Sequence, residues 1–273
     1  MKKLNLINMN NKNLNFLNKL IDNNKKKEKN IYQLSPNSFS NKGIIEGIKV
    51  LLSKRITMGK ITKRFEKEFA KFIGSKYALM VNSGSSANLL ATFAMVNPMK
   101  KNRLKSGDEC LIPSLCWSTS LWPIIQAGLK PKFVDVDPKT LNISLKDLEK
   151  KINKKTKAIV LVHVLGNSVN MKKLKKIIRK YKIKLIEDAC ESLGSKLKNK
   201  YLGTFGDYGT FSFYYSHQIT SGEGGMVTCN KKEDYDILFA LRSHGWLGGT
   251  RFYKRNLKLY NAYAKQNPKL DPR

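Results

Sequence analysis

The sequence predicts an α/β fold with a mostly parallel, seven-stranded sheet and helices on both faces. Short apolar runs alternate with longer segments of helical periodicity over most of the 273 residues. Strands separated by helices of this length are typical of parallel sheets whose two faces are covered. Hydrophobic residues make up 41% of the chain and aromatic residues 10%, so a buried core is feasible.

The first expected elements precede the sheet. Residues 1–34 are rich in Lys and Asn and contain a weak amphipathic stretch at 14–21, so we expect an arm that is partly disordered or packed on a partner subunit. Residues 41–74 have a helical pattern of apolar positions that breaks at residues 57–59. They therefore predict helical structure on both sides of that break.

The alternation of strands and helices follows. The expected strands are residues 77–82, 109–113, 132–135, 157–163, 183–187, 210–214 and 225–229. The expected helices are residues 86–96, 119–127, 145–152, 171–181 and 231–242. After residue 245 the pattern weakens.

Charge and cysteine content narrow the class of protein. The net charge of +32 is not accompanied by an RNA-binding aromatic motif, zinc-finger spacing or an Arg-rich stripe, so we expect no nucleic-acid partner. The charge is expected to attract an anionic substrate. The four cysteines show no C-x-x-C spacing, no apolar signal segment opens the chain, and no stretch approaches the ~20 apolar residues of a membrane helix. We therefore expect a soluble cytoplasmic protein without a membrane partner.

The segment 82–88 reads Asn-Ser-Gly-Ser-Ser-Ala-Asn, follows an expected strand and opens an expected helix. Backbone amides at a helix N-terminus, beside a glycine that permits close approach, form a site for anions. A serine that only caps a helix is the alternative. The segment alone leaves both interpretations open.

Two further candidates lie just beyond expected strands. Asp188 follows the mostly apolar residues 183–187, and the carboxyl ends of parallel strands are where open α/β sheets place ligand contacts. An ordinary helix N-cap would also explain this aspartate. Trp117 either stacks on a flat ligand or belongs to the core.

His217 stands in the run Ser-Phe-Tyr-Tyr-Ser-His-Gln-Ile-Thr-Ser-Gly-Glu-Gly-Gly, which extends from Ser212 to Gly225. An imidazole takes or gives a proton near neutral pH, because its ordinary pKa is about 6.5. A histidine in a loop can instead only cap a backbone carbonyl. The other two histidines, His163 and His244, are expected to be structural or peripheral.

Together these segments resemble the DegT/StrS family of sugar aminotransferases, which are fold-type I enzymes that use pyridoxal phosphate (PLP). The resemblance rests on the Ser-Gly segment at 82–88, the Glu-Asp-Ala-Cys-Glu segment at 187–191 and the frame around His217. Family members have a lysine at the place of His217, which holds the cofactor as a Schiff base. A histidine at this place is typical of a small branch, the sugar 3-dehydratases that use pyridoxamine phosphate (PMP).

The resemblance implies how the cofactor is held. The amides of Ser85 and Ser86 and the hydroxyl of Ser212 would bind the cofactor phosphate. Trp117 would stack on the pyridine ring. Asp188 would pair with the pyridine nitrogen and keep it protonated, so that the ring absorbs electrons.

It also implies the catalytic groups and the reaction. Glu191 would lie close to the ring hydroxyl or the reacting carbon, and His217 would take a proton from carbon C4′ of PMP, with Asp188 stabilising the electron-rich ring. The substrate would be a nucleotide-linked 4-keto-6-deoxyhexose that loses its C3 hydroxyl, and an amino donor such as glutamate would restore the cofactor. Such sugars enter lipopolysaccharide and O-antigen.

Two other interpretations stay open: an aminotransferase-family enzyme of other specificity, and an inactive fragment. An ordinary aminotransferase would need another lysine at the cofactor. The nearest upstream lysines lie in a polar loop that does not match the motif. These are Lys196, Lys198 and Lys200.

Some histidine-bearing dehydratases also carry an iron–sulfur cluster held by four cysteines, and Cys190 stands at the place of the first ligand. The loop after Gly245 contains none of the remaining three, and one thiolate cannot hold a cluster. We therefore expect no metal and a similarity to the cluster-free sort found in colitose synthesis.

The resemblance also suggests a division of the chain into a Lys/Asn-rich arm (1–34), a large cofactor-binding domain (35–245) and the start of a C-terminal region (246–273). Family members continue into a smaller C-terminal domain and complete their site with residues of a partner subunit. We therefore expect a homodimer at full length, and we interpret the chain as a fragment or a truncated reading frame.

Overall fold

Seven strands form one sheet in the order β1-β9-β8-β5-β4-β2-β3 in a computed structural model that describes residues 9–23 and 39–253. The strands are β1 (Tyr77–Val81), β2 (Glu109–Pro113), β3 (Lys130–Val134), β4 (Thr156–Val162), β5 (Lys184–Asp188), β8 (Tyr208–Ser212) and β9 (Gly225–Cys229). All neighbours pair in parallel except β9, which is antiparallel to both β1 and β8. The six other strands therefore end at one edge of the sheet. The prediction of a mostly parallel seven-stranded sheet is confirmed.

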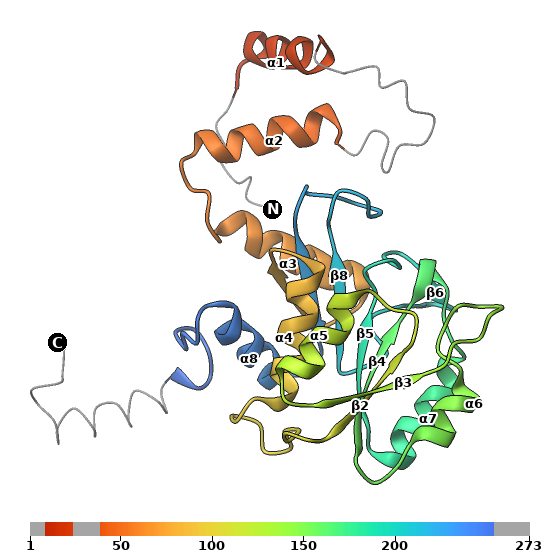
Figure 1. The fold of residues 1–273 in the computed structure, drawn as a ribbon. Coiled ribbons are helices and arrows are strands. Elements are labelled where there is room, and N and C mark those ends of the chain that lie inside the picture. The colour runs from red at the N-terminus through yellow and green to blue at the C-terminus, as the bar shows by residue number, and fades with distance from the viewer. Residues whose placement is uncertain (1–8, 24–38, 254–273) are drawn as a thin grey trace, which may run out of the picture.

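Helices cover both faces of this sheet, as Figure 1 shows. They are α1 (Asn11–Asn23), α2 (Asn41–Leu52), α3 (Lys60–Ile73), α4 (Gly84–Val96), α5 (Ser118–Gln126), α6 (Leu145–Lys151), α7 (Met171–Tyr181) and α8 (Lys232–Arg242). Helices α4, α5 and α8 pack on one face. Helix α3 packs on the other face over β1, β9 and β8, and α6 and α7 complete that face over the remaining strands.

Successive side chains of each strand enter opposite cores, because side chains alternate across a strand. In β5, Leu185 packs under α7, whereas its neighbour Ile186 packs under α4 and α5. This two-sided burial explains why the strands read as continuous apolar runs. The same alternation places Asp188 on the side of α4 and α5 and Glu187 on the opposite side.

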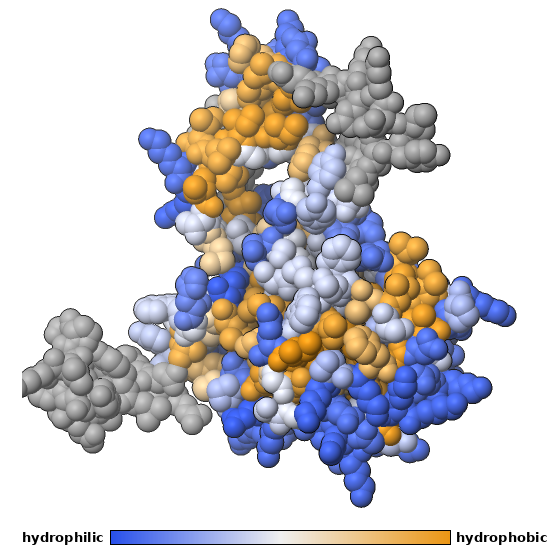
Figure 2. All heavy atoms as spheres, viewed as in Figure 1, coloured by the Kyte–Doolittle hydropathy of each residue, from blue (hydrophilic) through white to orange (hydrophobic). Residues whose placement is uncertain are grey.

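The N-terminal helices α1 and α2 lie beside one another, away from the sheet (Figure 1). The predicted amphipathic stretch 14–21 lies within α1, and parts of the predicted arm lie outside the described residues. Figure 2 shows apolar side chains over α2 and hydrophilic ones around α6 and α7. Leu51, near the end of α2, is 65% exposed, and Ile56, in the segment between α2 and α3, is 71% exposed.

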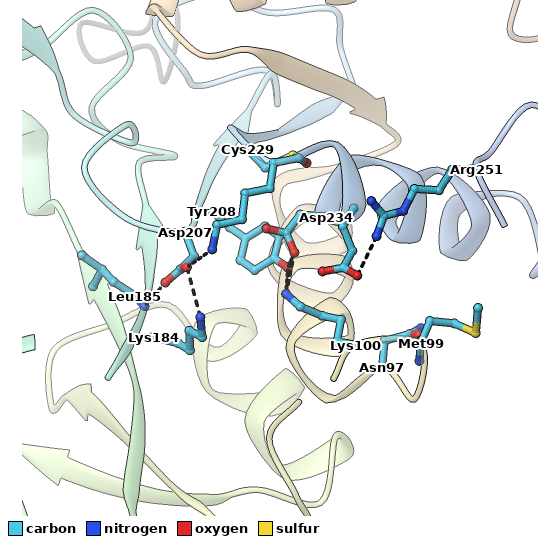
Figure 3. Close-up of polar contacts among 12 residues, drawn as sticks. Asn97, Met99, Lys100, Lys184, Leu185, Asp207, Tyr208, Cys229, Asp234 and Arg251 are labelled. Atoms are coloured by element: carbon cyan, nitrogen blue, oxygen red, sulfur yellow. Dashed lines mark hydrogen bonds and ion pairs between the residues drawn. The ribbon is translucent and has the colours of Figure 1, made fainter. Parts of the chain in front are cut away.

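A closed polar cluster ties α8 to the edge of the sheet where β8 begins (Figure 3). The Lys100 ammonium donates to Asp234 Oδ1 and to the Tyr208 hydroxyl at 2.9 Å, and the same hydroxyl donates to Asp234 Oδ1 at 2.8 Å. Burial, and then the charge of Asp234, raises the pKa of Tyr208 far above its usual range, so the phenol keeps its proton. The cluster therefore contains one cation, one anion and one neutral donor.

One segment differs from the sequence-based expectation. The polar loop around Lys198 forms a two-stranded hairpin of β6 (Lys196–Leu197) and β7 (Lys200–Tyr201). Strands of two residues are too short to produce a periodic pattern, which explains why the loop interpretation was wrong. Within residues 9–23 and 39–253, no helix is long and apolar enough to cross a membrane.

Candidate functional site

Helix α4 begins at the carboxyl end of β1 with its first backbone amides open. The Ser83 hydroxyl caps the helix by accepting from the Ser86 amide at 3.0 Å. The amides of Gly84 and Ser85 precede the first intrahelical bond and have no acceptor among the described residues. The segment is therefore both a serine-capped helix and a group of amides available to an anion.

Ser212, the last residue of β8, lies against Gly84. A Cβ added to Gly84 would stand 2.7 Å from the Ser212 Cβ and 2.8 Å from the Cys190 sulfur. Only a glycine permits this approach, which brings the Ser212 hydroxyl beside the open amides of α4. Three predicted residues, Ser85, Ser86 and Ser212, thus lie at one helix terminus.

Asp188 ends β5 and is 5% exposed. Its Oδ2 accepts hydrogen bonds from Asn88 Nδ2 at 2.7 Å and from Ser120 Oγ at 2.6 Å, and its Oδ1 accepts one from the Cys190 amide at 3.2 Å. All three donors are neutral, as is the Cys190 thiol, which also interacts with Asp188. No cation lies among these partners in the described part of the chain, which leaves the carboxylate available to an incoming positive group.

Trp117 is the N-cap of α5, beside the open end of α4. Its side chain is 73% exposed, which excludes the core alternative. A hydrogen bond of 3.1 Å from Ser85 Oγ to Thr119 Oγ1 joins the first turns of α4 and α5. The exposed indole therefore stands at the rim of the region that contains Asp188 and Ser85.

His217 lies in the loop that connects β8 to β9 and packs edge-on against Tyr214. Its side chain makes no hydrogen bond to any other described residue, so it does not cap a carbonyl within that part of the chain. Gln218, next to it, donates to the Glu191 carbonyl at 2.7 Å, and the Glu191 carboxylate accepts from the Leu165 amide at 2.8 Å. These contacts join the His217 loop to the segment after β5.

Burial lowers the pKa of His217 below its ordinary value, and the charges of Glu191 and Asp188 partly oppose that effect. Burial and then the charge of Asp188 raise the pKa of the Cys116 and Cys190 thiols. At neutral pH the imidazole is therefore neutral and able to accept a proton, while both thiols stay protonated.

The remaining predicted candidates lie away from this centre. His163 is fully buried on the opposite face, where its Nε2 lies 2.8 Å from Glu187 Oε2, which agrees with the structural role predicted for it. The ammonium groups of Lys196 and Lys200 lie over the rings of Tyr201 and Phe205. No group of three or more metal-ligating side chains occurs in the described part of the chain.

Asn88, Ser120 and Thr210 were not predicted, although they surround Asp188. Asn88 and Ser120 are 4% and 1% exposed on mostly apolar faces of α4 and α5. A buried amide or hydroxyl needs a partner, so a polar residue at an apolar helical position was the signal available in the sequence. A separate cavity of about 1070 Å³ lies between residues 53–62 and α4 and reaches this region at Ser86.

Residues 41–265 match the model of the DegT/DnrJ/EryC1/StrS aminotransferase family. The GDP-4-keto-6-deoxy-D-mannose 3-dehydratase of Escherichia coli O55:H7 is 50% identical to the chain over 197 residues, which are 72% of this chain and 50% of that protein. The chain thus spans about half the length of the curated relatives it matches.

Two solved structures are similar in fold and sequence. A variant of GDP-4-keto-6-deoxymannose-3-dehydratase with bound GDP-perosamine has a TM-score of 0.77 at 45% identity, over 80% of this chain and 56% of that chain. The same enzyme with a trapped PLP-glutamate geminal diamine has a TM-score of 0.76 at 46% identity, over 79% of this chain and 55% of that chain.

Proposed function

Because the chain belongs to the DegT/DnrJ/EryC1/StrS aminotransferase family, we propose that it is a PMP-dependent 3-dehydratase of a nucleotide-linked 4-keto-6-deoxyhexose. The observation that carries this proposal is His217, a neutral imidazole in the loop after β8, at the place where aminotransferases of this family have a lysine. The names of the relatives support GDP-4-keto-6-deoxy-D-mannose as the substrate.

The open end of α4 fits a cofactor phosphate. The free amides of Gly84 and Ser85, the nearby Ser86 and the Ser212 hydroxyl would hold it, and the close approach at Gly84 leaves no room for a side chain between them. Asp188 would hold the proton of the pyridine nitrogen, and the exposed Trp117 would cover the ring. Bound PMP supplies an amine that condenses with a keto sugar and a ring that takes up electrons.

His217 would move the proton in this reaction. Burial keeps the imidazole neutral, so it can accept a proton from the carbon beside the cofactor amine and return one to the departing C3 hydroxyl. The charge of Glu191 acts on the same imidazole, and this carboxylate would orient the imidazole or contact the ring hydroxyl. The electrostatic proximity of both carboxylates, Glu191 and Asp188, to His217 supports this arrangement.

The proposal includes the partners of the reaction. Glutamate would restore the amine, which the PLP-glutamate adduct bound to a similar enzyme supports. The product would serve lipopolysaccharide and O-antigen synthesis, as the name of a relative in Salmonella typhimurium, lipopolysaccharide biosynthesis protein RfbH, suggests. We further propose a homodimer and a cytoplasmic location, the latter because all four cysteines are free thiols.

The test is whether a lysine at position 217 converts the site. Borohydride should fix no PLP on the unaltered chain, whereas His217→Lys should gain a reducible covalent link to PLP, found by mass spectrometry on the peptide that contains position 217. His244→Asn is the matched control, because His244 is exposed, lies outside the site and has a positive φ that asparagine tolerates. A phosphopyridoxyl-lysine in the unaltered chain would refute the role of His217.

Turnover gives the second arm of the test. With PMP, glutamate and GDP-4-keto-6-deoxy-D-mannose, loss of the proton-transfer group in His217→Asn should lower the rate about 10²–10⁴-fold relative to His244→Asn. Formation of an amino sugar in place of a 3-deoxy sugar would instead identify an aminotransferase of other specificity.

A further inference from the structure

We propose that Asn88 is a positioning residue that fixes the orientation of the Asp188 carboxylate, and that Thr210 in turn fixes the amide of Asn88. The inference rests on the proposed function, in which Asp188 faces the cofactor ring. It assigns a role to two residues that touch neither the phosphate site nor His217.

The Asp188 oxygens have unequal surroundings. Oδ2 accepts two short hydrogen bonds, from Asn88 and from Ser120, whereas Oδ1 accepts one bond of 3.2 Å from the Cys190 amide. Each carboxylate oxygen can accept two hydrogen bonds in its plane. Oδ2 is therefore fully bonded, and Oδ1 is the oxygen with capacity left for an N–H donor, since the Cys190 thiol beside Asp188 is only a weak donor.

Thr210 gives the Asn88 amide a single orientation. Its hydroxyl donates to Asn88 Oδ1 at 2.6 Å, while the Glu187 carbonyl is 3.4 Å away and the weakly hydrogen-bonding Cys190 thiol also lies beside it. With the carbonyl oxygen held in this way, the Asn88 NH₂ group faces Asp188. The reversed amide would place its oxygen against Oδ2 and lose both bonds, which is costly for groups this deeply buried.

The chain of donors crosses rigid elements. Thr210 belongs to β8 and is fully buried, Asn88 belongs to α4 and is 4% exposed, and Asp188 ends β5. Thr210 donates to Asn88, Asn88 donates to Asp188, and both donors are neutral. The network thus fixes the geometry of the carboxylate without cancelling its charge, which is what a partner for a protonated ring nitrogen requires.

The experiment compares Thr210→Val with Thr210→Ser. Valine keeps the shape of threonine and removes the donor, whereas serine keeps the donor and removes a methyl group. We expect Thr210→Val to bind PMP about tenfold more weakly, which is about 1.4 kcal/mol, and Thr210→Ser to bind within about threefold of the unaltered chain. Asn88→Ala should weaken binding at least as much as Thr210→Val.

Two readouts separate positioning from a general packing defect. With PMP labelled with nitrogen-15 at the ring, the pH at which the ring nitrogen loses its proton should fall in Thr210→Val and return in Thr210→Ser. Crystal structures of the ligand-free Thr210→Val and unaltered chains should differ in the Asp188 side-chain torsion angles or in the Asn88 amide.

The outcomes are distinguishable. An unchanged Asp188 carboxylate and an unchanged ring-nitrogen midpoint in Thr210→Val overturn the inference, even if turnover falls. If the unaltered chain fails to bind PMP, the proposed function fails, and the Asp188 orientation in the two ligand-free crystal structures still decides whether Thr210 and Asn88 position it.

Discussion

Two buried aspartates at opposite edges of the sheet have opposite kinds of partners. Asp234, where β8 begins, shares its Oδ1 with the Lys100 ammonium and the Tyr208 hydroxyl (Figure 3). Asp188, where β5 ends, is bonded within the described part of the chain by the neutral donors Asn88 and Ser120 and a backbone amide. Both carboxyls are at most 5% exposed.

The two carboxylates differ in whether a cation within the protein balances their charge. The charge of Asp234 is balanced inside the protein by the Lys100 ammonium. The cluster therefore ties α8 to the sheet and leaves no uncompensated charge for a ligand. Asp188 has no cationic partner among the described residues that bond it, and it lies at the edge where the open amides of α4 also lie. Burial alone therefore does not distinguish the two aspartates, whereas the charge of their hydrogen-bond partners does.

The largest expected effect is at Asp234. Asp234→Ala leaves the Lys100 ammonium buried without an anion and the Tyr208 hydroxyl without an acceptor, so the free energy of unfolding should fall by about 3–5 kcal/mol. PMP affinity should stay within about threefold. Urea unfolding measures the first quantity and fluorescence titration the second.

Glu233→Ala is the matched control for that variant. Glu233 also belongs to α8, but its ion pair with Arg251 lies at the surface. It should cost less than about 1 kcal/mol. Equal losses from the two variants would mean that the buried cluster is no more important than a surface pair.

The next effect is at Asp188. Asp188→Asn keeps the shape of the side chain and one oxygen for Asn88 or Ser120, so unfolding should change by about 1 kcal/mol or less. Loss of the negative charge should weaken PMP binding about 100-fold, or about 2.7 kcal/mol. If the same substitution instead unfolded the protein and left affinity unchanged, the contrast between the two aspartates would be reversed.

The smallest effect concerns Glu191. Burial already lowers the pKa of His217, and the charge of Glu191 partly restores it. Glu191→Gln should therefore lower that pKa further. Any activity that needs the neutral imidazole should then persist to a lower pH than in the unaltered chain. Proton NMR titration of ligand-free protein measures this, with His244 as the internal reference.

An upward shift of the His217 pKa in Glu191→Gln would contradict the assigned sign. An unchanged value would mean that the charge of Glu191, whose carboxylate accepts from the Leu165 amide, does not act on the imidazole in solution.

The sequence predicted the sheet because each strand is buried on both faces and reads as an apolar run. It predicted Asp188 and His217 because both lie in local frames that resemble a known family. The two-residue strands around Lys198 lacked such a pattern, and the loop interpretation was wrong there. Periodicity detects elements only when several side chains share one environment.

The partners of Asp188 could not be read in the same way. Asn88 lies 100 positions from Asp188 in the sequence, and Ser120 lies 68 positions away. Only the packing of α4 and α5 on one face of β5 brings them together, and no local pattern encodes that contact. The Lys100–Asp234 pair spans 134 positions and was missed for the same reason.

The antiparallel strand β9 has a consequence for how the His217 loop can change. Because β9 lies directly beside β8, with Ser212 opposite Gly225, the loop leaves and re-enters the sheet at neighbouring positions. Its ends are held at a fixed separation by the ladder, so its closure entropy depends only weakly on its length. Phe213 and Gly224 continue this anchoring, because the Phe213 amide donates to the Gly224 carbonyl and the Phe213 ring is buried under α3. We therefore expect that a different loop in place of residues 214–223 would change the position of the reactive side chain without altering the strand order.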